Sequence, residues 1–386
     1  MCSECIRISK VALWLLAISV SMFCATDSQG PAGTANSWSP KAAAAYLDHR
    51  TGWWEAWPTA ARDHNTFCIS CHTAVPYALS RPALRAVLGE SAPTSAEQTL
   101  LSNVTKRVRL WNQVAPFYND KKPGDDKSAR SRGTEAVLNA LVLASHDAES
   151  GGLTSDTRAA FDNMWPLQQD TGGASGSWLW LQFNNEPWEA RDSEYYGAAL
   201  AAVAVGTTPQ HYRFTPSIQH NLKLLSDYFN REYPNQSILN HVFLLWASVR
   251  WPGLLKPERQ AAIVNEVVNK QLADGGWNLA SLIWTWRDWG LFSFISMLRS
   301  DGSPLERKTD PYATGLVTFV LEQVAVPSAN MPAKRGLEWL ARNQDKTKGL
   351  WRSYSVNRRR DLSSGIGLFM SDAGTAYAVL ALTTGR

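Results

Sequence analysis

The feature that most constrains this chain is a turn that recurs three times in its carboxyl-terminal two thirds. Each copy has a glutamine at the end of an expected helix, then a glycine-containing turn, then a tryptophan; the copies are residues 168–178, 271–277 and 344–351. Glycine ends helices because it adopts the left-handed backbone conformation without a steric penalty. The glutamine can bond the backbone groups freed at the turn, and the tryptophan can stack on it. Such recurrence is typical of architectures in which similar units pack side by side.

Apolar residues recur at helical spacing from residue 133 to the end of the chain, and no comparable alternating series indicates regular strands. The predicted helices are 134–145, 198–205, 218–229, 238–249, 257–272, 312–324, 333–343 and 373–382. Glycine and proline fall between these segments and separate them. An aspartate precedes three small-residue helices, in the position of an N-cap: Asp192, Asp310 and Asp372. The sequence therefore predicts an all-α fold.

The three turns and the aspartate-capped helices together resemble the QW repeat of the squalene-hopene cyclase and prenyltransferase group, whose fold is an α/α toroid. The resemblance covers roughly residues 130–386, and 271–277 is the best copy. It implies concentric rings of helices, in which the inner helices point their starts toward one rim of a central cavity. Asp192, Asp310 and Asp372 would then gather at that rim as candidate catalytic acids or bases, unless they act only as helix caps. The D-x-D-D motif with which the family's cyclases protonate their substrate is not found here, and a shared fold does not transfer chemistry.

Before residue 133 the helical pattern is less regular. A cap at 37–40 leads into a predicted helix at 41–49, and further helical segments are expected at 82–88 and 95–111. Residues 52–58 are predicted as an aromatic loop in which Gly52 and Trp53 stand in for the glycine and tryptophan of the repeat. Residues 118–132 are predicted as a charged surface loop.

This region carries the chain's second distinctive feature, the C-x-x-C-H pentapeptide of residues 68–72. Two thiols three residues apart can each add to a vinyl group of haem, and the adjacent imidazole becomes the proximal iron ligand. The motif predicts covalent haem c, with Cys68 and Cys71 as thioether anchors and His72 as the metal ligand. A chance match, a disulfide and half of a zinc site are the alternatives, although no second thiol pair is present to complete a four-thiolate site.

The first thirty residues read as an export signal. A basic start with Arg7 and Lys10 precedes an apolar stretch at 11–20, which is too short for a comfortable membrane span. Residues 1–30 are therefore a signal peptide or a membrane anchor, and Cys24 leaves lipidation open. The protein is expected in the periplasm or otherwise exported, with membrane association through the N-terminus as an option. Export and haem attachment support each other, because thioether attachment takes place outside the cytoplasm.

The position of the motif suggests how haem and toroid are combined. Residues 72–79 align with 372–379, so that Tyr77 matches Tyr377 and His72 takes the place of Asp372. The chain from 37 to 386 is therefore predicted to be one toroid, with the haem at the start of an inner helix and at the mouth of the cavity. The competing interpretation is a small amino-terminal cytochrome module that ends near residue 125.

The sixth iron ligand stays open at this level. His64 is close to the motif in sequence but badly placed to reach the opposite face of the haem. The other candidates are His49, His146, His220, His241, Met164, Met297 and Met370. A His or Met ligand favours electron transfer, whereas an open position favours chemistry on a substrate.

Composition narrows the range of partners. The net charge of +4 is small for 386 residues and gives no reason to expect a nucleic-acid partner. The 18 tryptophans provide wide aromatic surfaces that suit an apolar or saccharide ligand in the cavity. The expected function is electron transfer with a redox partner, or haem-dependent oxidation of a ligand held in the cavity. A cyclase or lyase that uses the cavity carboxylates, and a non-catalytic lipid- or polysaccharide-binding protein, are the alternatives.

Overall fold

The computed structural model describes residues 37–119, 126–283 and 298–384. The predicted signal at 1–30 lies outside these residues, and so does Met297. The structure is 61% helix and 4% strand, with thirteen helices in the described part, which confirms the all-α prediction. Asn36–Arg386 forms one compact unit, and the segment that carries C-x-x-C-H belongs to it.

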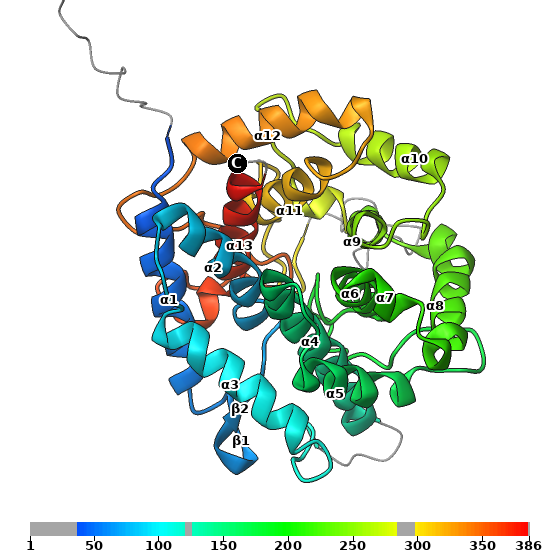
Figure 1. The fold of residues 1–386 in the computed structure, drawn as a ribbon. Coiled ribbons are helices and arrows are strands. Elements are labelled where there is room, and N and C mark those ends of the chain that lie inside the picture. Colours follow the sequence, from blue (N-terminus) through cyan, green and yellow to red (C-terminus); the bar gives the residue numbers. More distant parts are fainter. Residues whose placement is uncertain (1–36, 120–125, 284–297, 385–386) are drawn as a thin grey trace, which may run out of the picture. The chain divides into compact units, whose positions relative to one another are not determined.

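Six helices contact one another in a closed cycle, and we refer to them as the inner helices (Figure 1). In order around the cycle they are α2 (Ala74–Leu88), α4 (Lys127–Ser150), α6 (Ser193–Thr207), α9 (Ile238–Arg250), α11 (Pro311–Leu321) and α13 (Phe369–Thr383). The cycle closes because α13, at the end of the chain, packs against α2. Helices α6, α11 and α13 are buried along most of their length, as expected of helices that are apolar on every side.

Six outer helices alternate with the inner ones along the chain, and each packs against an inner neighbour. They are α1 (Pro40–Ala56), α3 (Ser95–Arg109), α5 (Ser155–Met164), α8 (Gln219–Glu232), α10 (Pro257–Val268) and α12 (Asn330–Arg342). A short helix, α7 (Gln210–Arg213), and a two-stranded hairpin of β1 (Ala61–Arg62) and β2 (Thr66–Phe67) complete the named elements. The stretch Ile366–Thr383 is long and apolar enough to cross a membrane, but it contains α13 and is mostly buried in the core.

The three glutamine turns join successive outer helices. Gln271 donates from Nε2 to the carbonyl of Gly275 in its own turn and to that of Pro332 in α12. Gln168 bonds Gly176 and Asn221 of α8 in the same way. These contacts confirm that the glutamines bond backbone groups at the turns. They also give each glutamine a role that its sequence position does not reveal, because each side chain ties one outer helix to the next.

The third copy closes the outer ring. Gln344 accepts from the backbone N–H of Ser39 at 2.6 Å and donates to the Ser39 carbonyl at 3.1 Å, across 305 residues of chain. The tryptophans of the turns are buried, and each indole N–H donates to a carbonyl at the end of the preceding outer helix rather than serving only as a stacking surface. The pairs are Trp178 with Met164, Trp277 with Val267, and Trp351 with Leu340.

Two loop predictions require correction, and one helix was not predicted. Residues 52–56 are not a loop, because α1 continues through Gly52, Trp53 and Trp54 until Pro58 approaches. A glycine in a helix costs only about 1 kcal/mol, and packing of the tryptophans offsets it. These residues therefore do not replace the glycine turn of the repeat. Residues 127–132 are also helical, since α4 begins at Lys127 behind an Asp126 cap. Helix α5 was not predicted as a separate helix.

Candidate functional site

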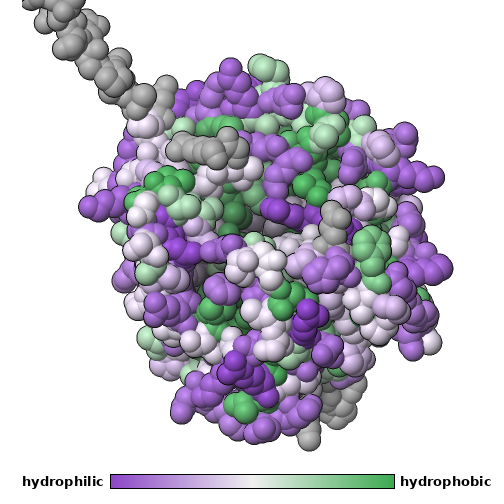
Figure 2. Space-filling model, viewed as in Figure 1, coloured by the Kyte–Doolittle hydropathy of each residue, from purple (hydrophilic) through white to green (hydrophobic). Residues whose placement is uncertain are grey.

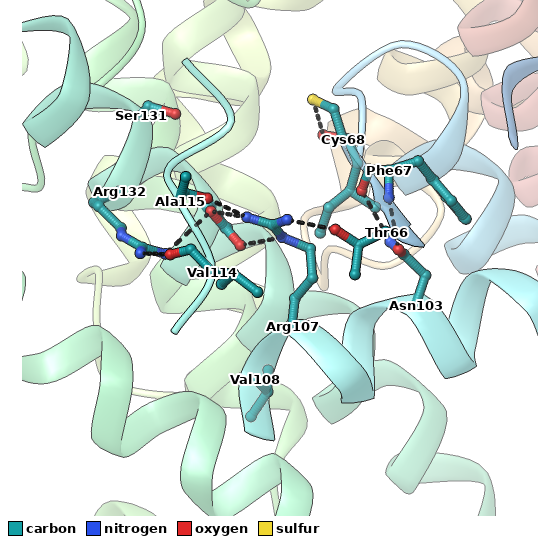
Figure 3. A network of polar contacts seen from close by, with 12 residues as sticks. Thr66, Phe67, Cys68, Asn103, Arg107, Val108, Val114, Ala115, Ser131 and Arg132 are labelled. Carbon is teal, nitrogen blue, oxygen red and sulfur yellow. Dashed lines mark hydrogen bonds and ion pairs between the residues drawn. The ribbon is translucent and has the colours of Figure 1, made fainter. Parts of the chain in front are cut away.

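The segment that leads into C-x-x-C-H is held in place by buried polar side chains (Figure 3). Asn103 of α3 accepts from the N–H of Phe67 at 2.8 Å and donates to its carbonyl at 3.0 Å. Arg107, one turn along α3, is fully buried and donates to Thr66 Oγ1 at 2.7 Å and to both carboxylate oxygens of Glu135 in α4. The backbone before Cys68 is thus fixed from two neighbouring helices.

The motif itself is a tight turn that opens α2. Trp54 donates from its indole N–H to the Cys68 carbonyl at 2.7 Å. The hydroxyl of Ser70, between the two cysteines, accepts from the N–H groups of Thr73 and Ala74. Two of the free N–H groups at the start of α2 are satisfied in this way. His72 therefore stands at the amino-terminal end of an inner helix.

Both cysteines are buried and form no disulfide, with 7% of Cys68 and 6% of Cys71 exposed, and the Cys68 thiol donates to the Ile69 carbonyl at 3.7 Å. Burial raises the pKa of Cys68 to about 12 and that of Cys71 well above its usual value, and the nearby Glu189 carboxylate adds to both effects. The thiols are neutral at ordinary pH. The charges of Arg62 and Arg107 act against this at Cys68, but the effect of burial on its pKa is larger.

His72 lies among aromatic rings. Its imidazole stacks on Phe369 of α13, with ring centroids 3.7 Å apart and planes at 20°. The ring of Trp54 meets it edge-on at 5.0 Å, and Trp188 lies at 5.7 Å. Burial lowers the pKa of His72 to about 3, and the charge of Arg50 acts in the same direction. The imidazole is therefore neutral at physiological pH.

A chain of hydrogen bonds fixes the tautomer of this imidazole. Asp372 accepts from Tyr46 Oη, Arg50 Nε, Arg50 Nη2 and Thr73 Oγ1, all at 2.7–2.8 Å. Because Thr73 donates its proton to Asp372, its oxygen can only accept from His72 Nδ1, which lies 2.9 Å away. The proton of the neutral imidazole is then on Nδ1, and the lone pair on Nε2 is left for a ligand.

The three candidate aspartates all lie at the starts of inner helices, but they differ in what they bind. Asp310 is an N-cap as predicted, since it accepts from Ala313 N at 3.0 Å; burial raises its pKa to about 6. Asp192 has the N-cap position of α6 but accepts from the side chain of Asn240 in α9. Asp372 is not an N-cap. It lies in the first turn of α13, where Arg50 binds it, so His72 does not take its place in the repeat.

The candidates for the sixth ligand are spread over the structure. His49, His146 and His220 are exposed, while His241 bonds Glu266 at 2.8 Å and stacks on Tyr233. His64 pairs with Asp63 in the hairpin loop, and Met164 is buried at the end of α5. Met370 is buried directly after Phe369, the residue that stacks on His72. It is the candidate closest in sequence to a residue that contacts the motif histidine.

A cavity of about 610 Å³ lies within the inner cycle, but at its other end. Its lining comes from the carboxyl-terminal parts of the inner helices and includes neither the motif nor Asp192, Asp310 or Asp372. The expectation that these aspartates converge on the cavity is wrong for this cavity. Each is instead occupied by hydrogen bonds at the opposite end of the cycle.

No group of three His, Cys, Asp or Glu side chains within the described ranges is arranged to hold a metal ion. Cys68, Cys71 and His72 therefore do not converge on one point as zinc ligands would. A haem needs less from the protein, because its own ring supplies four nitrogen ligands and the chain adds axial ones.

Sequence reasoning missed the residues that hold His72, namely Tyr46, Arg50, Trp54 and Thr73. One signal was present in the sequence. Arg50 belongs to the buried stripe of α1, spaced with Ala43, Leu47 and Trp54. An arginine in an apolar stripe implies a buried partner. The identity of that partner, 322 residues away, could not be read from the spacing.

Comparison with known proteins adds no family to this description: no protein-family model matches the chain, and no curated protein matches it.

Proposed function

We propose that this chain is an exported c-type haem protein built on an α/α toroid of the terpenoid-cyclase kind, and that it works in redox chemistry. The observation that carries the proposal is the hydrogen-bond chain from Asp372 through Thr73 to His72. It keeps the histidine of C-x-x-C-H neutral with Nε2 free, which is the form that binds iron. The closed cycle of alternating inner and outer helices supports the toroid.

The residues present suit a covalently attached haem. Cys68 and Cys71 would form the thioethers, and His72 would be the proximal ligand. When bound, the haem supplies one-electron redox chemistry. The protein's own contribution is orientation and shielding. Thr73 and Asp372 hold the Nδ1 proton, and Phe369 and Trp54 fix the plane of the imidazole and keep water from it.

The role of the haem protein depends on the far side of the iron. A protein ligand such as Met370 would suit electron transfer to a redox partner, whereas an open position would suit oxidation of a bound ligand. The proposed location is the periplasm or another exported compartment, with association to the membrane through the amino-terminal segment as part of the same proposal.

A cyclase or lyase is the second candidate, and Asp310 is the observation that favours it. A buried carboxyl group with a pKa near 6 is suited to general acid chemistry. Its contacts weigh against this role, because the same carboxylate caps α11 through Ala313. An acid that holds a helix start is less free to move a proton to a substrate.

The test is expression of the full chain with a cytochrome c maturation system, followed by acid-acetone extraction and a pyridine haemochrome spectrum. We expect a Soret band that stays with the protein, and its loss in the Cys68→Ala, Cys71→Ala double variant. Cys24→Ala, outside the motif, is the matched control and should retain the band. Wild-type protein that matures without covalent haem would refute the proposal.

Carbon monoxide then separates the two redox roles. If the sixth position is open, the reduced protein shifts its Soret band on exposure to carbon monoxide. If Met370 fills it, the shift appears only in Met370→Ala. A shift of equal size in both proteins would exclude Met370 as the ligand.

A further inference from the structure

The cavity of about 610 Å³ is built by every inner helix. Its lining includes Leu79 of α2, Ala148 of α4, Val203 of α6, Trp246 of α9, Phe319 of α11 and Leu380 of α13. It is therefore an axial cavity at the carboxyl-terminal end of the cycle, with both apolar and polar side chains in its walls. Its size is that of a small-molecule site, for which about 300–1,000 Å³ is usual. The face of the molecule in Figure 2 mixes hydrophilic with smaller hydrophobic areas.

Most polar groups in this lining already have partners. Arg85 binds Glu149 and Glu97, and Glu90 binds Arg81. The hydroxyls of Thr207, Thr383 and Thr384 donate to carbonyls in the last turns of α6 and α13. These groups therefore have little remaining capacity for binding a charged ligand.

Arg250 is different. It stands in the last turn of α9, faces the cavity, and has no ion-pair partner within the described ranges. Arg250 is an exposed residue, and the partial desolvation of its guanidinium lowers its pKa with no carboxylate to oppose the effect. One turn earlier on α9, Trp246 also lines the cavity, and its indole N–H is buried without an acceptor among the described residues. The exposed guanidinium of Arg250, which has no ion-pair partner, and the buried, unsatisfied indole N–H of Trp246 thus lie one turn apart on the same helix.

Close packing holds Arg250 in this position. A Cβ atom at Gly206 of α6 would lie 2.5 Å from the carbonyl carbon of Arg250 and 2.8 Å from its Cβ. Only a glycine lets the last turn of α9 approach α6 this closely. The guanidinium is therefore presented by a rigid backbone rather than by a loop.

We propose that the axial cavity binds an amphiphilic carboxylate, with its apolar chain between Leu79, Val203 and Phe319 and its carboxylate at Arg250. The proposal concerns a different end of the cycle from the motif and does not rest on haem. A bidentate guanidinium–carboxylate pair is the strongest polar contact that the lining offers.

The helix ends oppose this charge, but only weakly. Each carboxyl-terminal end contributes about half a negative charge, which fades within a turn. The threonine hydroxyls bonded to the carbonyls of α6 and α13 reduce it further. The six ends together carry about three units of partial negative charge, but each acts only over a short range, whereas the Arg250 guanidinium donates hydrogen bonds directly to a carboxylate. An anion bound at Arg250 is therefore the expected head group.

The test is calorimetric titration of the full chain with three ten-carbon probes below their micelle concentrations: decanoate, decan-1-ol and decyltrimethylammonium. We expect saturable one-to-one binding of decanoate, weaker by about tenfold for the alcohol, because a hydrogen-bonded charge pair is worth roughly that factor. The ammonium probe should bind least. Equal affinity for acid and alcohol, tighter binding of the ammonium, or no saturable binding would overturn the proposal.

Variants then assign the site. Arg250→Gln should weaken decanoate binding about tenfold without altering the binding of decan-1-ol. Val203→Trp, which fills the cavity, should abolish both. Arg342→Gln is the matched control, since Arg342 is an exposed arginine in the last turn of an outer helix. Unchanged decanoate affinity in Arg250→Gln, or an equal loss in Arg342→Gln, would refute the assignment.

Discussion

The two ends of the inner helices differ in how their polar groups are satisfied. At the amino-terminal end, Asp372 accepts four hydrogen bonds from α1 and from the start of α2, and Asp310 caps α11. At the carboxyl-terminal end, Arg250 has no ion-pair partner and one carboxylate oxygen of Glu322 is buried without a bond, within the part of the chain that the structure describes.

The polar groups at the amino-terminal end therefore contribute to stability, whereas those at the carboxyl-terminal end are available for binding. Paired buried charges fix the C-x-x-C-H segment in one geometry, and removal of either partner leaves an uncompensated charge. The other end keeps a cavity and groups whose bonding capacity is not used by the fold. Substitutions at the first end should therefore cost stability, whereas those at the second should change stability little.

The largest effect is expected for Asp372→Asn. It leaves Arg50 buried without its carboxylate, which should lower the free energy of unfolding by about 3–5 kcal/mol. The measurement is the urea midpoint followed by tryptophan fluorescence. Asp156→Asn, which breaks the exposed pair with Arg109, is the matched control and should cost less than about 1 kcal/mol. Similar losses in both variants would mean that burial does not distinguish the two ends.

The turn at the third glutamine repeat should come next. Gly349 has a φ of +77°, and a Cβ there would lie 1.9 Å from the Ala42 carbonyl oxygen, so Gly349→Ala should cost more than about 2 kcal/mol. Gly253 has a φ of +90° with open space around it, and Gly253→Ala should cost only about 1 kcal/mol. Thermal unfolding of the two variants compares them. A smaller loss of stability in Gly349→Ala than in Gly253→Ala would show that the backbone around Gly349 and Ala42 can shift to accommodate a side chain.

Thr73→Val tests the relay to His72. It removes two buried hydrogen bonds and should destabilise the protein by about 1–2 kcal/mol. If the protein binds haem as proposed, the variant should also have a higher midpoint potential, because an imidazole without an Nδ1 hydrogen bond would be a weaker donor to oxidised iron. Thr73→Ser keeps the hydroxyl and should restore both values. An unchanged midpoint potential in Thr73→Val would show that the hydrogen bond from His72 to Thr73 does not affect the proposed iron ligand.

The smallest effect is expected at the carboxyl-terminal end, at Glu322. Burial raises its pKa to about 8 from 4.5, so the folded protein holds a proton that the unfolded chain releases. The contribution of the protonated Glu322 carboxyl to the stability of the folded protein is fully present below pH 4.5 and is lost as the pH rises toward 8. Glu322→Gln should therefore be neutral at pH 4.5 and stabilise by about 1 kcal/mol at pH 8.5, since partial exposure screens the group. The measurement is the urea midpoint of both proteins at pH 4.5 and at pH 8.5. Stabilisation by Glu322→Gln at pH 4.5 would contradict the predicted direction of the pH dependence.

Much of the secondary structure could be predicted because it depends on residues three or four positions apart. Ser39 and Asp310 cap their helices as their types indicate, and the glycines at the glutamine turns adopt positive φ. The candidate site was less predictable. The positions of Cys68, Cys71 and His72 followed from their spacing, but the partners of His72 did not. The three aspartates were predicted to line a cavity that they do not line. The spacing of residues in the sequence does not show at which end of the inner helices a cavity lies.

The sequence by itself determined that the chain is helical, where the central parts of most helices lie, and that two thiols and an imidazole are adjacent. These are local properties of the backbone and of short motifs. The tertiary structure decided what joins across hundreds of residues: Gln344 to Ser39, Asp372 to Arg50, and six helix ends around one cavity with Arg250 at its wall. The physical reason is that ring closure brings together side chains from distant parts of the chain, and only their packing fixes which charges are paired and which are left to bind a ligand.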